Sequence, residues 1–523
     1  MRGCERFGLG ILVRILLLTV ATWLGLPSRL ACAAADPPRT LAELDRDFTA
    51  TAAGLARRAA AGGHAELASL ISGWQLPEAE GVQIVLAIPP TAARDAPPDW
   101  IDTDAERALW DAFLDARRQR AAGTYALAIA ATNPPVPGRP TKDAADPAGL
   151  AGSQPRTAEA IRLLYRTLWD DPGHERAREA GGWVRRGTSW VWPEVARRLD
   201  KGEEFSPAFG WLPPGRQQRY AAGERYQGGR WITAEAAHRE APKPTRAARD
   251  AAADFDRRGR RFAADHWQIT TDASDEAAAE LARGLEECHT AWLQVFGGFQ
   301  HEPEEWNRRL EGRTRPKPLD PFVAKLTARR EDYVVALQPV EPMIARTLGI
   351  YWMPTHTAWF FEGEGQSPAT VHHEAVHQLF AEKRRTSPLA GERCGFWAIE
   401  AAACYMESLT PAGFGWTLGG REAGRLPAAR ERLLDDGFHV PLAELCSLGR
   451  RELQNDERLP MIYSQISGLA DFFMNGQRGR HREAFVEYLV RIYTGTVDPD
   501  TLARLCGVGY AELDDDYRRH MAR

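Results

Sequence analysis

The sequence predicts an α+β protein built from several modules, and three observations support this. At 523 residues the chain is too long for one ordinary hydrophobic core, so two to four domains are expected. Its content of 44% hydrophobic and 26% charged residues is typical of a folded protein. In the C-terminal half, strand-like segments come first and amphipathic helices follow, which is the order found in α+β architectures.

The first 35 residues have the features of a cleavable signal peptide. Arg2, Arg6 and Arg14 precede or interrupt an apolar stretch at 15–26, and alanine-rich A-x-A sites follow before Asp36. The apolar stretch is short for a membrane span, so membrane association is expected only if the leader stays uncleaved. The sequence therefore predicts export to the periplasm, the cell surface or the medium.

Residues 36–155 are predicted to form a helical N-terminal region that ends in a proline-rich linker. Apolar residues recur at helical spacing in Leu41–Ala61, His64–Ser72 and Thr103–Ala131. Five prolines among polar residues then occupy Pro134–Pro155, which is typical of a linker.

Residues 156–245 are predicted to contain small Trp-rich hairpin modules. After a helix at Ala158–Leu168, two similar segments at 181–191 and 223–232 place aromatic and β-branched residues around glycine turns. Each is followed by a short helical run, at Pro193–Leu199 and Ala234–Arg239. Such aromatic residues either form a small core or bind a peptide, glycan or envelope partner, and the sequence leaves both open.

A charged linker at 246–264 is predicted to lead into the last module, 265–523. Strands are expected at Trp267–Thr271, Phe322–Thr327 and Thr357–Phe361. The strand around Trp359 is either a core strand or a sheet edge that pairs with an extended peptide. Helices are expected at five places: Asp275–Phe296, Ala369–Arg384, Phe396–Glu407, Leu459–Asn475 and Arg482–Tyr493.

The run Val371–His377 contains the pattern H-E-x-x-H. On a helix, His373 and His377 point from one face and can share one metal ion, while Glu374 can reach a metal-bound water. Residue frequencies give at most roughly 0.04 chance occurrences of this pattern in the chain. His372 points about 100° away around the helix, so we interpret it as a neighbour rather than a ligand.

A catalytic zinc needs a third protein ligand, and the following helix offers two candidates. Glu400 lies in an Ala-rich apolar run, where a charged residue is rarely buried unless it is paired or binds a metal. Glu407 lies two turns later on nearly the same face. We predict Glu400 as the ligand, and leave Glu407 as the competing ligand or as an acceptor for a histidine N–H.

These residues resemble a known family. The motifs His373-Glu374-x-x-His377 and Trp397-x-x-Glu400, with Tyr405, resemble those of the peptidase-MA-like gluzincin zinc metallopeptidases. The resemblance is to a bacterial secreted group in particular, long described as a domain of unknown function. The resemblance covers roughly 265–494. It implies a catalytic domain of a small sheet plus active-site helices, a Zn²⁺ cofactor, and a peptide or protein substrate. In that group a Gly-x-Tyr segment, here Gly349–Tyr351, and a hydrophobic strand precede the zinc helix.

The resemblance also assigns Tyr463. It begins a segment similar to the helix in gluzincin aminopeptidases where a tyrosine donates to the developing oxyanion, so Tyr463 is expected to be catalytic beside Glu374. Ile466 replaces the glycine usual in that segment, and a tyrosine that packs in the core is the alternative. Two further departures are Ala401, where glycine is usual, and Cys404, where thermolysin-like enzymes place an aspartate that orients a zinc histidine.

The sequence thus predicts an exported zinc-dependent peptidase with N-terminal accessory modules. Two alternatives stay open: a non-catalytic envelope scaffold or binding protein that retains a zinc domain, and a hydrolase of non-protein amides such as peptidoglycan cross-links. The net charge of −5 gives no indication of a nucleic-acid partner. After the leader, five cysteines remain, of which at least one must lack a partner in the chain; Cys394 and Cys446 could pair.

Overall fold

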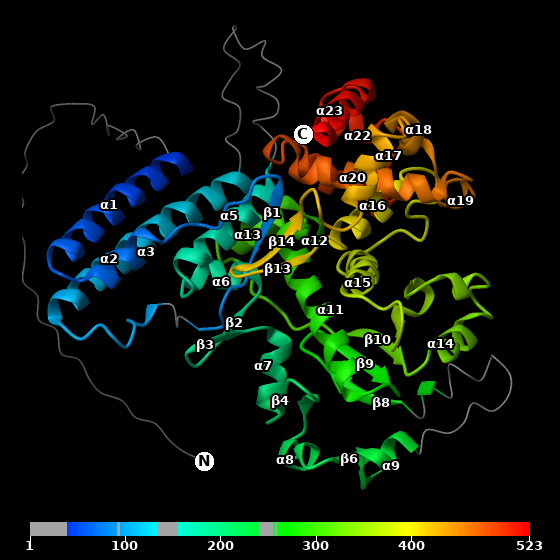
Figure 1. Cartoon of the computed structure of the whole chain (residues 1–523), viewed down its shortest axis with the longest axis horizontal. Helices are drawn as coiled ribbons and strands as arrows, with labels where there is room; N and C mark the ends of the chain where they lie inside the picture. The colour runs from blue at the N-terminus through cyan, green and yellow to red at the C-terminus, as the bar shows by residue number, and fades with distance from the viewer. Residues whose placement is uncertain (1–38, 92–94, 134–154, 228, 240–254, 257–258) are drawn as a thin grey trace, which may run out of the picture. The chain divides into compact units, whose positions relative to one another are not determined.

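The computed structural model describes residues 39–91, 95–133, 155–227, 229–239, 255–256 and 259–523. Over these residues the chain is a mixture of helices and small open sheets, which confirms the predicted α+β class (Figure 1). Every element named here belongs to one compact unit, Thr40–Arg523. The predicted signal peptide, nearly all of the proline-rich linker and residues 240–254 lie outside the described residues.

The N-terminal region forms helices where the hydrophobic spacing predicts them. Thr40 accepts from the Glu43 N–H while the Glu43 carboxylate accepts from the Thr40 N–H, and Thr103 and Glu106 make the same capping box. The apolar faces pack around rings such as Phe113. The helices are α1 (Leu41–Ala61), α2 (Ala65–Ser72), α3 (Asp104–Thr132) and, after the linker, α5 (Thr157–Asp170).

One strand of this region belongs to a sheet formed with the C-terminal half of the chain. β1 (Val82–Leu86) pairs antiparallel with β14 (Gly415–Gly419), which also pairs with β13 (Thr410–Ala412). The side-chain amide of Gln294 accepts from the Leu86 N–H at 2.9 Å and donates to the Leu86 carbonyl at 2.8 Å. The region predicted as helices and linker therefore also supplies an edge strand that packs with the C-terminal core.

The Trp-rich region contains three hairpins, each followed by a short helix, within the described residues. The sequence repeat predicts the first and third, but it does not predict the second, which lies between the two repeated segments. Trp183 stacks on Trp192 with ring centroids 4.7 Å apart, so part of the aromatic content makes a small core. The elements are α6 (Glu175–Gly181), β2 (Val184–Arg186), β3 (Ser189–Val191), α7 (Pro193–Asp200), β4 (Glu204–Ser206), β5 (Gly210–Leu212), α8 (Gln217–Ala221), β6 (Glu224–Gln227), β7 (Arg230–Thr233) and α9 (Ala234–Arg239).

A five-stranded sheet in the described chain has the order β11-β12-β10-β9-β8. β12, β10 and β9 run parallel, and β11 and β8 are antiparallel edge strands. β12 contains Trp359, lies inside the sheet and is buried along its whole length, so the idea that it offers an edge to a peptide is wrong. The strands are β8 (Arg260–Ala263), β9 (Trp267–Thr271), β10 (Phe322–Thr327), β11 (Ile350–Trp352) and β12 (Thr357–Phe361).

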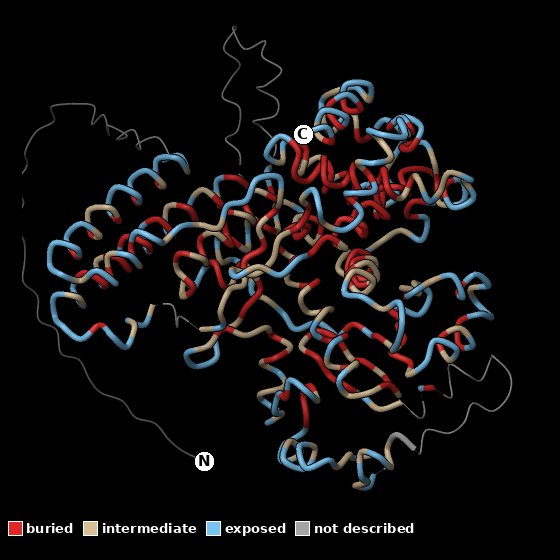
Figure 2. Tube along the Cα trace, in the orientation of Figure 1, coloured by how far each residue is buried: buried red, intermediate tan, exposed pale blue. Residues whose placement is uncertain are grey.

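The largest hydrophobic core joins this sheet to helices on its C-terminal side. Every residue of α16 is buried, as are most of those in α20, which Figure 2 shows in red. A helix without a polar face is buried on all sides, so α16 is the central element of this core. The core helices are α11 (Asp275–Val295), α15 (Pro368–Glu382), α16 (Phe396–Met406) and α20 (Leu459–Asn475).

Further helices surround this core. Among the described residues no helix combines the length and apolar character that crossing a bilayer requires. Cys394 and Cys446 are free thiols, so the disulfide considered from the sequence is not formed. The remaining elements are α12 (Gly297–Gln300), α13 (Pro303–Leu310), α14 (Arg330–Leu337), η2 (Ile344–Arg346), η3 (Met353–Thr355), α17 (Leu426–Leu434), α18 (Leu442–Ser447), α19 (Arg450–Gln454), η4 (Gly476–Arg478), α21 (Arg482–Thr494), α22 (Thr501–Cys506) and α23 (Tyr510–Ala522).

Candidate metal centre

Helix α15 carries the two predicted histidine ligands. The Ser367 hydroxyl caps the helix by accepting from the Thr370 N–H, and Pro368 occupies the first turn, where its missing N–H costs nothing. Residues four apart on a helix share a face, and the Nε2 atoms of His373 and His377 lie 3.1 Å apart. Two imidazole nitrogens therefore converge on one point.

Helix α16 brings Glu400 to the same point. Glu400 Oε2 lies 3.6 Å from His373 Nε2, and Glu400 Oε1 lies 3.8 Å from His377 Nε2. Ligand atoms around a tetrahedral zinc lie about 3.3–3.6 Å apart, given bonds of about 2.0–2.2 Å. The three side chains are thus grouped closely enough to hold one metal ion, as the sequence predicts.

The approach of α16 depends on a glycine. Gly395 precedes the helix with φ of 74°, in the left-handed region that side chains rarely adopt. A Cβ atom there would lie 2.8 Å from the Tyr488 hydroxyl. A side chain here would strain the backbone and crowd Tyr488, so Gly395 favours the start of α16 at this point and hence the position of Glu400.

Glu407, the competitor for the third ligand, lies on the other side of His373. Its Oε1 atom is 2.8 Å from His373 Nδ1, and its two oxygens accept from the Arg425 guanidinium at 2.7 and 2.9 Å. A carboxylate on the far nitrogen of a ligand histidine fixes its ring orientation and tautomer. The geometry gives Glu407 this orienting position, although Cys404 also lies within range of His373 and Glu407.

Glu374 and Tyr463 both lie at the centre. Glu374 Oε2 accepts from the Tyr351 backbone N–H of β11 at 2.7 Å, and the Tyr463 hydroxyl donates to Glu400 Oε2 at 2.9 Å. Gly349 lets β11 approach, because a Cβ there would lie 3.1 Å from Glu374 Cγ. The ring of Tyr463 also packs against the core, as the alternative interpretation of this residue expects.

Burial and charge set the protonation of these groups. Burial would raise the pKa of Glu400, but His377, His373 and Tyr463 outweigh it and hold that pKa at about 2. Burial lowers the pKa of His377 to about 4, and desolvation raises the pKa of Glu374. Burial lowers the pKa of His373, but Cys404, Glu400 and Glu407 outweigh it and raise that pKa, so a metal ion that binds there must displace a proton. Glu400 is ionised and His377 is neutral, which are the forms that bind a divalent transition metal.

His372 lies apart from this group, as the sequence predicts. It is buried, and neither ring nitrogen has a hydrogen-bond partner among the described residues.

Sequence reasoning missed two groups at this centre, the Arg425 side chain and the Tyr351 N–H. The Gly-x-Tyr segment marks Tyr351 only through the family resemblance, and no sequence pattern marks Arg425.

A second group of possible metal ligands, His266, Glu286 and His289, is less suitable. The carboxylate of Glu286 is already bonded to the His266 N–H at 2.7 Å and to His266 Nδ1 at 2.6 Å. The two imidazole rings are tilted against one another, with centroids 4.0 Å apart and 36° between planes. Those of His373 and His377 are at 76°, so that both can direct a nitrogen to one ion.

The orienting contact predicts an effect on metal affinity. Replacing Arg425 by alanine removes the partner that holds Glu407, so the His373 ring loses its support, and we expect the affinity for zinc to fall about 10–100-fold. Zinc affinity is measured by competition with a chromophoric chelator. Arg421→Ala, an exposed arginine four residues away, serves as the control, and equal affinities in both variants would reject the role of Arg425.

Comparisons with protein-family models, with curated proteins and with solved structures find no match for this chain. The function of this chain is therefore inferred from the arrangement of His373, His377, Glu400 and Glu374, together with the sequence patterns around them.

Proposed function

We propose that this protein is an exported zinc-dependent peptidase of the gluzincin type. The observation that carries the proposal is the convergence of His373, His377 and Glu400 on one point, with Glu374 on the same helix beside it. Two histidines and one carboxylate are the ligand set of zinc peptidases that keep a fourth position open for water. Zinc bound here would polarise the carbonyl group of the substrate and lower the pKa of the water that it binds.

The side chains around the centre have matching roles. Glu374 is the general base that takes a proton from the attacking water and delivers it to the leaving amine nitrogen. The Tyr351 N–H holds the Glu374 carboxylate in place. Tyr463, whose hydroxyl reaches Glu400, is placed to donate to the oxyanion that develops on the substrate carbonyl.

The sheet edge that serves a peptide is β11 rather than β12. β11 pairs with β12 on one side only, and the Tyr351 N–H points away from β12 toward Glu374. An extended peptide that adds to an open sheet edge gains backbone hydrogen bonds whatever its sequence. A peptide on this side of β11 would pass Glu374, which supports hydrolysis of peptide bonds.

The accessory modules have a separate proposed role. Phe205 on β4 is 49% exposed and Tyr226 on β6 is 38% exposed, so aromatic side chains remain accessible on these hairpins. We propose that the hairpins bind a partner in the cell envelope. The features of residues 1–35, which lie outside the described residues, support export to the same compartment.

The test of the proposed function is the metal content of the purified chain, for the wild type and Glu400→Ala together. We expect about one zinc per wild-type chain, since one complete ligand set is present, and much less in the variant. Metal is measured by plasma mass spectrometry after gel filtration. A folded wild type that takes up no zinc even when the metal is supplied would overturn the proposal.

Substrate class is tested next, by digestion of casein and of purified muropeptides with the zinc-loaded chain. Release of new amino termini from casein is the expected result. Cleavage of muropeptides alone would replace the proposed peptidase by a hydrolase of peptidoglycan cross-links.

A further inference from the structure

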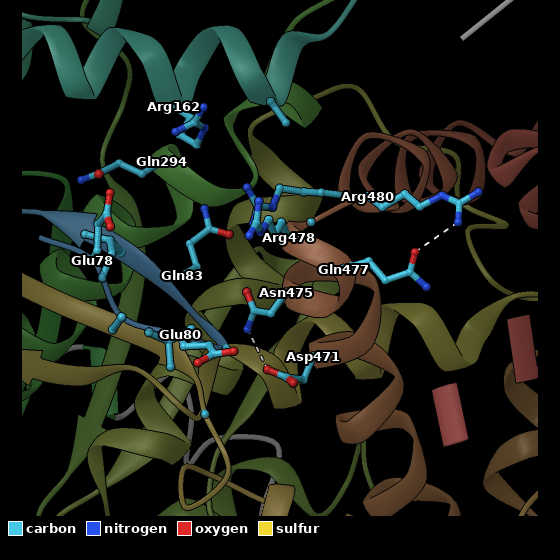
Figure 3. Close-up of a pocket in the computed structure, with 18 of the residues that line it drawn as sticks. Glu78, Glu80, Gln83, Arg162, Gln294, Asp471, Asn475, Gln477, Arg478 and Arg480 are labelled. Carbon is cyan, nitrogen blue, oxygen red and sulfur yellow. Dashed lines mark hydrogen bonds between the residues drawn. The ribbon is translucent and has the colours of Figure 1, made fainter. Parts of the chain in front are cut away.

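A large cavity lies away from the metal centre, between β1, α5, α20 and the C-terminal end of α23 (Figure 3). Its volume is about 1780 Å³, and none of His373, His377 and Glu400 lines it. Asn475 in its wall follows Tyr463 by twelve residues on α20, which is about 18 Å along a helix. The cavity is therefore distinct from the proposed active site.

The lining has the opposite charge to the chain as a whole. It holds nine arginines and five acidic residues, although the net charge of the chain is −5. Two of the acids are already engaged, since Glu159 pairs with Arg162 at 2.7 Å and Asp471 contacts His520 at 2.7 Å. The arginines that line it are Arg156, Arg162, Arg166, Arg421, Arg430, Arg478, Arg480, Arg482 and Arg523.

Three of these arginines are free to meet a ligand. The side chains of Arg156, Arg421 and Arg478 are exposed, and none of their guanidinium groups makes a hydrogen bond or ion pair with the described residues. Arg480, by contrast, donates to Gln477 at 3.1 Å, as the dashed line in Figure 3 shows. Guanidinium groups bind carboxylates through paired, charge-assisted hydrogen bonds, so three free groups in one cavity favour an anionic ligand.

One wall of the cavity is the open edge of β1. Along an antiparallel strand, the backbone N–H and C=O groups of successive residues point alternately to one side and the other. Those of Leu86 point away from β14 and bond to the side chain of Gln294. The backbone groups of Ile84 and Val82 therefore face the same way, on the side where β1 has no strand partner in the described chain. An unpaired strand edge is a template for an added strand.

Two further observations mark this cavity as a binding site. Gln83 is 7% exposed, lines the cavity, and its Oε1 atom has no hydrogen-bond partner within the described residues. Buried polar atoms are almost always paired, so an unpaired one next to a cavity indicates a missing partner. Gln477 and Arg478 have φ of 50° and 61°, a left-handed conformation that costs free energy and places both residues in the lining.

We propose that this cavity binds an extended acidic segment of another polypeptide. The segment pairs with the open edge of β1 and places its carboxylates against Arg156, Arg421 and Arg478. The volume exceeds the roughly 300–1,000 Å³ of small-molecule pockets, which favours a polymer over a single small anion. The proposal does not depend on zinc or on hydrolysis.

The experiment is calorimetric titration of the full chain with an acetylated, amidated peptide of four Glu-Val repeats. The Glu374→Gln background prevents cleavage of the peptide. We expect saturable binding that weakens as salt is added, and a loss of at least about 10-fold in affinity in Arg421→Ala/Arg478→Ala. Arg57→Ala/Arg107→Ala changes the charge equally on the exposed faces of α1 and α3 and should leave the affinity within about 2-fold.

The strand pairing is tested on the peptide rather than on β1, so that folding is not disturbed. A peptide methylated on alternate backbone nitrogens cannot donate along one edge, and we expect it to bind at least about 10-fold more weakly. No saturable binding of the acidic peptide, or equal affinities in the two double variants, would overturn the proposal. Binding that depends on the arginines but ignores the methylation would also overturn it, in favour of an anion that is not a strand.

Discussion

Glu374→Gln is expected to reduce hydrolysis of an unstructured protein substrate by about 10²–10⁴-fold while zinc stays bound. Glutamine keeps the size of the side chain and still accepts from the Tyr351 N–H, but it cannot take a proton from water. His373, His377 and Glu400 are untouched, so the metal content should match that of the wild type. The measurement is kcat/KM on fluorescently labelled casein, together with zinc per chain.

The control for this variant is Glu364→Gln, a change of the same kind in the exposed loop before α15, which should leave kcat/KM unchanged. Retained hydrolysis in Glu374→Gln would show that Glu374 is not the base. If hydrolysis ceased but the biological activity of the chain persisted in cells, the zinc domain would serve as a scaffold rather than as an enzyme.

The largest expected effect on stability lies far from the metal. Asp170 at the end of α5 is fully buried and binds Arg120 of α3 through two hydrogen bonds, at 2.6 and 2.7 Å, and accepts from Trp74 at 3.2 Å. Asp170→Ala leaves the Arg120 guanidinium, 6% exposed, without its main partner. Removing one member of a buried ion pair costs about 3–5 kcal/mol, and we expect a loss of that size.

The measurement is urea unfolding followed by far-ultraviolet circular dichroism. Asp200→Ala breaks an ion pair on the surface, in which the Asp200 side chain is 65% exposed and that of Arg186 is 42% exposed. This control should lower the free energy of unfolding by no more than about 1 kcal/mol. Similar unfolding midpoints for the two variants would show that the α3–α5 pair does not stabilise this region.

Local patterns in the sequence predict the three parallel strands and the core helices of the C-terminal module, but not its shorter elements. The strands at Trp267–Thr271, Phe322–Thr327 and Thr357–Phe361 are β-branched or aromatic runs, and they form as predicted. The pairing of β1 with β14 was not predicted, because more than 300 residues separate them and register between distant strands leaves no local pattern. The β4–β5 hairpin was missed for a different reason, since its segment lies outside the sequence repeat through which the equally short strands β2 and β3 were predicted.

The candidate site likewise contains residues whose positions the sequence predicts and residues whose positions it does not. Helical spacing places His373 beside His377, because that relation is internal to one helix. It cannot choose between Glu400 and Glu407, which lie two turns apart on nearly one face of the same segment. The packing of α15 against α16 places Glu400 at the two Nε2 atoms and Glu407 at Nδ1. Arg425 comes from the loop before α17, where sequence offers no periodicity to read.

The pairing of β1 with β14 has a consequence for any attempt to isolate the C-terminal module. A fragment that starts at residue 265 lacks β1, so β14 loses its antiparallel partner and Gln294 loses both backbone contacts. The core also loses Val85, which is fully buried in it. Exposed strand edges promote aggregation, so a fragment cut at this boundary should be insoluble. Proteolytic trimming to that point would for the same reason destroy the protein instead of maturing it.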